Sequence, residues 1–130
     1  MRKKRILLVD DEHNLLVLLK LNLEKTNRYE VKLEHRAMEV LAAAEAFKPD
    51  LIMMDFMMPE MNGTEVAAKL QANQELKHIP VIFLTASVAK GNQEQRKEHF
   101  GGRPMLSKPA SPEEVIACIE QHLIDFKDTE

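Results

Sequence analysis

The chain has 130 residues, of which 45% are hydrophobic and 30% charged, and its formal net charge is -3. This length suits one hydrophobic core and is too short for two, so we expect a single domain over residues 1–130 with an ordered core over about 4–126. The excess of acidic over basic residues leaves no broad basic surface, which argues against nucleic acid as a direct partner.

Neither an export signal nor a membrane span is expected from the sequence. The basic N-terminus is followed by an apolar run at 6–9 that meets Asp10 and Asp11 too soon for a signal peptide. A spanning helix needs an apolar run of about 20 residues, and the sequence contains none. The single cysteine, Cys118, cannot form an intramolecular disulfide. We therefore expect a cytoplasmic protein without a membrane partner.

Short aliphatic segments alternate with longer segments of helical period along the sequence. In chain order, the pattern predicts strand 5–9, helix 12–25, strand 29–34, helix 38–47, strand 51–54, helix 64–72, strand 81–84, helix 92–99, a strand around 105–106 and a helix ending near 126. Such alternation is typical of a parallel sheet covered by helices. Gly63 is expected in the turn before the helix at 64–72.

The predicted strands differ in their side-chain patterns. In 29–34, Tyr29, Val31 and Leu33 alternate with charged residues, as in a half-exposed edge strand. The segments 51–54 and 81–84 are continuously apolar, as in central strands. Under the right-handed crossover rule, these features favour an α/β, doubly wound, five-stranded parallel sheet in the order 2-1-3-4-5, the flavodoxin-like arrangement.

The last predicted helix has the clearest start signal. Ser111 is expected as its N-cap, Pro112 as its first residue, and Glu114 as the residue that completes a capping box. These three positions place the start of the helix from local chemistry alone.

Polar residues follow four of the predicted strands directly. Asp10 and Asp11 follow the first strand and Asp55 follows the third. Thr85 follows the fourth strand and Lys108 the fifth. Because the carboxyl ends of parallel strands meet at one edge of a sheet, these side chains are expected to converge there. Clustered carboxylates repel one another unless a cation lies among them, and oxygen ligands suit Mg²⁺ better than zinc.

Such a cluster predicts phosphoryl chemistry. A carboxylate can attack phosphorus and form an acyl phosphate if cations neutralise the transferring oxygens. Asp55 would be the acceptor and Lys108 would supply a fixed positive charge. The hydroxyl of Thr85 could hydrogen-bond a phosphoryl oxygen only after transfer, which would make the site a switch.

Six segments form one pattern: LLVDDE at 7–12, PDLIMMD at 49–55, MP at 58–59, MNG at 61–63, LTA at 84–86 and KP at 108–109. Together they resemble the receiver domain of two-component response regulators, in order and at similar spacing over essentially the whole chain. The resemblance implies that Asp55 is phosphorylated from a phosphohistidine of a sensor histidine kinase or a phosphotransfer protein. It also implies a downstream protein or an output domain as the recipient of the signal, and leaves dimerisation open.

The resemblance implies a metal site as well. Asp10 and Asp11 would hold Mg²⁺ together with Asp55, Asp11 more directly than Asp10, and Met57 would contribute its backbone carbonyl. The same resemblance makes the domain a signalling receiver rather than an enzyme, one that catalyses only its own phosphorylation and dephosphorylation.

Further residues take their expected roles from the same family pattern. Thr85 would be the switch hydroxyl, Lys108 would pair with the phosphoryl group, and the peptide bond before Pro109 would be cis. Receivers usually have Tyr or Phe where this chain has Met105, and often Phe where it has Ala110. The sequence thus departs from the family at the usual position of an aromatic switch.

Each site residue also has an interpretation without chemistry. Asp11 could cap the first helix, and Asp55, Thr85 and Lys108 could be ordinary turn or cap residues. All of them would then meet at one sheet edge by coincidence. Two other functions stay open: a receiver-like interaction module that works without phosphorylation, and an aspartate-nucleophile phosphohydrolase, which would need an acid at the position of Met57.

Overall fold

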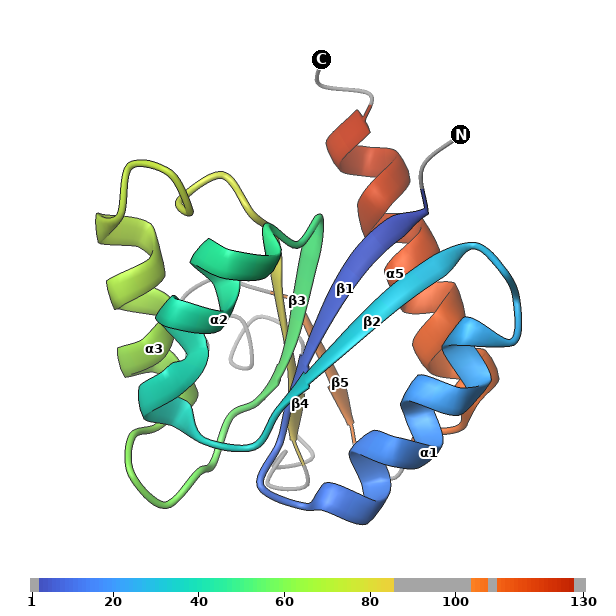
Figure 1. The fold of residues 1–130 in the computed structure, drawn as a ribbon, viewed down its shortest axis with the longest axis horizontal. Helices are drawn as coiled ribbons and strands as arrows, with labels where there is room; N and C mark the ends of the chain where they lie inside the picture. Colours follow the sequence, from blue (N-terminus) through green and yellow to red (C-terminus); the bar gives the residue numbers. More distant parts are fainter. Residues whose placement is uncertain (1–2, 86–103, 108–109, 128–130) are drawn as a thin grey trace.

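The computed structural model describes residues 3–85, 104–107 and 110–127, and within these residues five parallel strands form one sheet in the order β2-β1-β3-β4-β5 (Figure 1). The strands are β1 (Lys4–Val9), β2 (Tyr29–Glu34), β3 (Leu51–Asp55), β4 (Val81–Thr85) and β5 (Met105–Ser107). The strand order confirms the predicted doubly wound α/β fold.

Helices cover both faces of the sheet. They are α1 (His13–Glu24), the short 3-10 helix η1 (Ala37–Glu39) that leads into α2 (Val40–Phe47), α3 (Gly63–Ala72) and α5 (Pro112–Lys127). In Figure 1, α1 and α5 lie on one face and α2 and α3 on the other. The helix predicted at 92–99 falls outside the described residues. Among the helices that are described, none combines the length and apolar character needed to cross a bilayer.

Each face of the sheet has its own hydrophobic core. Successive residues of a strand point to opposite faces. In β1, Leu7 and Val9 therefore join the core beneath α2 and α3, whereas Ile6 and Leu8 join the core beneath α1 and α5. All four side chains are at most 1% exposed. Burial on both faces is the physical reason why the central strands are continuously apolar.

The β2 strand forms one edge of the sheet, as its alternating pattern predicts. Tyr29 and Val31 are buried, whereas Glu30 and Lys32 are exposed. The backbone N–H of Val31 donates to a carboxylate oxygen of Glu24 at 3.2 Å. This side chain at the end of α1 satisfies a backbone donor that an unprotected edge strand would offer to another chain.

Two capping boxes set the starts of helices. The predicted box at α5 is confirmed, because Ser111 Oγ accepts from the Glu114 N–H at 3.1 Å and Glu114 Oε1 accepts from the Ser111 N–H at 3.1 Å. A second box, formed by Asn62 and Glu65, starts α3. Gly63 is consequently the first residue of α3, and its predicted place in the preceding turn is wrong.

Candidate functional site

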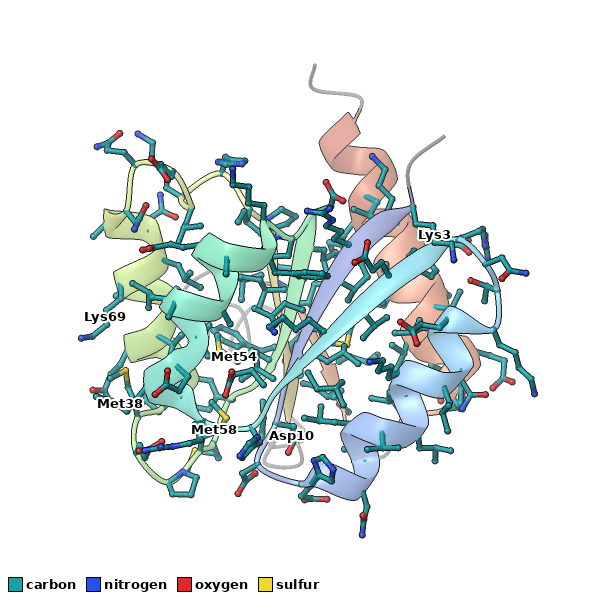
Figure 2. The ribbon with its side chains drawn as sticks, viewed as in Figure 1. Lys3, Asp10, Met38, Met54, Met58 and Lys69 are labelled. Atoms are coloured by element: carbon teal, nitrogen blue, oxygen red, sulfur yellow. The ribbon has the colours of Figure 1, made fainter. Side chains whose placement is uncertain are left out.

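Three predicted site residues lie together at the carboxyl edge of the sheet. Asp10 and Asp11 follow β1, and Asp55 is the last residue of β3, the neighbouring strand. One carboxylate oxygen from each residue lies within 4.8 Å of the other two. Figure 2 shows Asp10 at the lower end of the sheet in that view, where the chain leaves β1 for α1. The predicted convergence of these carboxylates is therefore present in the structure.

The three carboxylates differ in exposure. Asp10 is completely buried and Asp55 is 6% exposed, whereas Asp11 is exposed. Two buried carboxylates beside a third concentrate negative charge, and a cation among them would lower their mutual repulsion. The exposed Asp11 connects this cluster to solvent, so an ion can reach it.

The backbone at the start of α1 orients Asp10. Its Oδ1 accepts a hydrogen bond from the Glu12 N–H at 2.9 Å, which ties the carboxylate to the turn into the helix. The helix starts at His13 with Glu12, not Asp11, at the N-cap position. The interpretation of Asp11 as the helix cap is therefore wrong.

The segment after β3 brings the backbone of Met57 beside Asp55. Asp55 Oδ1 accepts from the Met57 N–H at 3.3 Å, while the Met57 side chain is 56% exposed. Two backbone bonds hold Phe56, the residue between Asp55 and Met57. Its N–H donates to the Leu84 carbonyl at 3.2 Å, and its carbonyl accepts from the Gly63 N–H at 2.6 Å. This bond places the Met57 backbone beside the carboxylate through its N–H, whereas the metal prediction uses the carbonyl of the same residue.

The donor set fits a hard divalent cation. Oxygens bound to one Mg²⁺ at about 2.1 Å lie about 3–4 Å from one another, so carboxylates within 4.8 Å need only small movements to share an ion. The clustered donor atoms are hard carboxylate oxygens, and three of the nearby methionines, Met53, Met54 and Met58, are buried in the two cores. Asp10, Asp11 and Asp55, with a backbone carbonyl, could hold Mg²⁺.

The other predicted site residues lie at or beyond the ends of β4 and β5. Thr85 ends β4 and is paired in register with Ser107, the last residue of β5, which places its backbone at the same sheet edge. Lys108 and Pro109 lie outside the described residues, so their roles stay predictions. Met105 is half-buried and packs against the core beneath α2 and α3.

Two contacts near this edge were not predicted from the sequence. The rings of His13 and His35 lie edge to face with centroids 6.4 Å apart. Arg36, after β2, forms an ion pair with Glu60, after β3, at 2.9 Å between Nη2 and Oε2. Both contacts join residues that are distant in sequence, and no local pattern indicates either of them.

Comparisons with known proteins identify the family of this chain. A family model described as the response regulator receiver domain matches residues 6–120. The polar-differentiation response regulator DivK of Brucella anthropi is 35% identical over 122 residues, which cover 94% of this chain and 98% of that protein.

Solved structures show similarity over nearly the same length. A CheY-like response regulator receiver domain protein from Methanospirillum hungatei JF-1 superposes with a TM-score of 0.84 at 28% identity, covering 99% of this chain and 100% of the other. The chemotaxis response regulator CheY4 of Vibrio cholerae has a TM-score of 0.80 at 26% identity, covering 92% and 98%.

Proposed function

We propose, from the premise that this chain belongs to the response regulator receiver family, that Asp55 accepts a phosphoryl group in a Mg²⁺-dependent reaction. The observation that carries this proposal is the cluster of Asp10, Asp11 and Asp55, with carboxylate oxygens within 4.8 Å at the carboxyl edge of the sheet. The three carboxylates and the backbone carbonyl of Met57 would hold the ion.

When bound, Mg²⁺ would neutralise negative charge on the transferring phosphoryl oxygens. A carboxylate oxygen of Asp55 attacks the phosphorus, so that a new O–P bond forms as the P–N bond of a phosphohistidine donor breaks and the leaving imidazole takes a proton from solvent. The hydrogen bond from the Met57 N–H to Oδ1 limits rotation of the Asp55 carboxylate. This orientation reduces the conformational entropy lost on reaching the transition state.

Thr85 and Lys108 would turn this modification into a signal. Lys108 would pair with the new phosphoryl oxygens, and the hydroxyl of Thr85 would hydrogen-bond one of them. The Thr85 bond would exist only after transfer, and together with the Lys108 pair it would favour one arrangement of the nearby loops over another. The position of Thr85 at the end of β4, beside β3, supports this role.

The proposed partners follow from this chemistry. The donor would be a phosphohistidine on a sensor histidine kinase or a phosphotransfer protein, and the recipient a downstream protein or an output domain whose binding changes on phosphorylation. The domain would act in the cytoplasm as a single receiver unit over residues 1–130. It would catalyse only its own phosphorylation and dephosphorylation.

The proposal predicts that a small-molecule phosphodonor modifies the purified protein. With an acyl phosphate or a phosphoramidate and Mg²⁺, intact-mass spectrometry is expected to show one added phosphoryl group per chain. A chelator should prevent the addition, and hydroxylamine should remove the group because it cleaves acyl phosphates. An unmodified protein in the presence of Mg²⁺, or modification that is insensitive to chelation, would rule out the proposed reaction.

A further inference from the structure

An ion pair connects the loop after β2 to the segment that follows Asp55. Arg36 lies between β2 and η1, and Glu60 lies in the segment 56–62 that joins β3 to α3. Arg36 Nη2 and Glu60 Oε2 are 2.9 Å apart. Glu60 is three residues after Met57, whose backbone N–H bonds to Asp55. The pair therefore links the segment that carries a proposed metal ligand to a different part of the chain.

Both members of the pair are held at more than one point. The pKa of the Glu60 carboxyl is below its usual value chiefly because Arg36 donates a hydrogen bond to it, and the backbone N–H of Met38 in η1 acts in the same direction. Arg36 in turn donates its backbone N–H to Glu34 Oε1 at 3.3 Å. These bonds position the Glu60 carboxylate against both the loop after β2 and the start of η1.

We propose that the Arg36–Glu60 pair positions the metal site, by holding the segment 56–62 where the Met57 carbonyl can bind the same ion as Asp10, Asp11 and Asp55. The inference rests on the proposed function, since it concerns the metal that this function requires. Arg36 and Glu60 are positioning residues in this account, because they act through the backbone of the segment and do not touch the ion.

A contribution to global stability is not the expected role of this pair. Its side chains are 54% and 35% exposed, and ion pairs at such exposure contribute little to the free energy of unfolding and are screened by salt. Metal binding is more demanding, because Mg²⁺ requires its ligands close to ideal octahedral positions. A small displacement of the segment can therefore weaken Mg²⁺ binding while the fold stays intact.

The test is the Mg²⁺ affinity of Arg36→Ala and Glu60→Ala, measured by calorimetric titration. Residues that orient metal ligands typically change affinity about 10–100-fold, and an exposed pair acting through a loop should give less, about three- to tenfold weaker binding in each variant. Phosphorylation of each variant should need a higher Mg²⁺ concentration than the wild type to reach half of its maximal rate. The rate at saturating Mg²⁺ should equal that of the wild type. The exchanged double variant Arg36→Glu/Glu60→Arg should recover part of the affinity.

The sign of the Arg36→Ala effect separates positioning from simple electrostatics. Loss of a positive charge near the site would by itself strengthen Mg²⁺ binding, whereas loss of Glu60 would weaken it. Positioning predicts weaker binding in both variants. The Arg28–Glu120 pair is a matched control, with side chains 57% and 38% exposed and a 2.6 Å contact at the opposite end of β2. Its alanine variants should bind Mg²⁺ like the wild type.

The outcomes distinguish this inference from the function on which it rests. One outcome is that the wild type binds Mg²⁺ and Arg36→Ala binds it as tightly or more tightly. This result would overturn the positioning role and leave the proposed function standing. Equal weakening by the Arg28→Ala control would also overturn it, because the effect would then not be local. Absence of Mg²⁺ binding by the wild type would reject both.

Discussion

Asp55→Asn is expected to take up no phosphoryl group under conditions that fully modify the wild type. A neutral amide lacks the anionic oxygen that would attack phosphorus, and it would also weaken the proposed metal site, which would neutralise the transferring group. Intact-mass spectrometry of both proteins after equal exposure to the donor and Mg²⁺ measures the difference. Modification of Asp55→Asn at the wild-type rate would place the acceptor elsewhere.

The fold of this variant provides its control. Asp55 is 6% exposed and its Oδ1 accepts from the Met57 N–H, a bond that an amide oxygen can also accept. Because the substitution removes one negative charge beside Asp10 and Asp11, the melting temperature without Mg²⁺ should be no lower than that of the wild type. Added Mg²⁺ should raise it less than in the wild type.

The same variant separates the receiver from an interaction module that works without phosphorylation. A phosphorylation-dependent partner should bind the modified wild type differently from Asp55→Asn. Equal partner binding by Asp55→Asn and by the wild type, with and without the donor, would favour the interaction module.

Gly63→Ala is expected to destabilise the domain by about 1–3 kcal/mol, the usual cost of overpacking a core. A Cβ at this position would lie 2.7 Å from Cε1 of Phe83 and 3.0 Å from Cα of Phe56. Phe83 is completely buried, and its ring packs edge to face on that of Phe56 at a centroid distance of 5.5 Å. Neither the ring nor the backbone can move without disturbing the turn next to Asp55.

A competing effect has the opposite sign. Alanine favours a helix over glycine by up to about 1 kcal/mol in a helix interior, but Gly63 is the first residue of α3, where this preference is weaker. Overpacking should therefore dominate. Urea unfolding of Gly63→Ala measures the net effect, and Thr64→Ala, at the exposed next position, should change stability by no more than about 0.5 kcal/mol. Equal or greater stability of Gly63→Ala would contradict the close contact with Phe83.

Local patterns were sufficient to predict much of the fold. The alternation of Tyr29, Val31 and Leu33 predicted the bounds of β2, because an edge strand has one buried face and one exposed face. The Ser111–Glu114 capping box predicted the start of α5, because it depends on neighbouring residues only. The apolar runs predicted β3 and β4 to within one residue at their ends.

Of the features that were missed, two are helix starts and one is a contact across the fold. Glycine is a frequent turn residue, so its preference alone predicts a turn at Gly63, whereas the Asn62–Glu65 capping box makes it the first residue of α3. The cap interpretation of Asp11 failed because Glu12 takes the N-cap position. Arg36 and Glu60 meet only after β2 and β3 are placed in the sheet, so no sequence spacing could indicate their contact.

The candidate site was predictable for a different reason. Parallel strands end at a common edge, so Asp10, Asp11 and Asp55 converge whenever β1 and β3 are neighbours. The sequence did not indicate that Asp10 would be completely buried and Asp11 exposed. That difference depends on the turn between β1 and α1, which the hydrogen bond from the Glu12 N–H to Asp10 stabilises.

A shared metal site is tested most directly by a Mg²⁺ titration of the wild type and of Asp11→Asn, followed by calorimetry. The wild type should bind one ion per chain, and Asp11→Asn should bind it at least about tenfold more weakly because a proposed ligand loses its charge. Circular dichroism should show the same fold in both proteins. Equal affinity in the two proteins, or no saturable binding by the wild type, would contradict a metal ion held between the ends of β1 and β3.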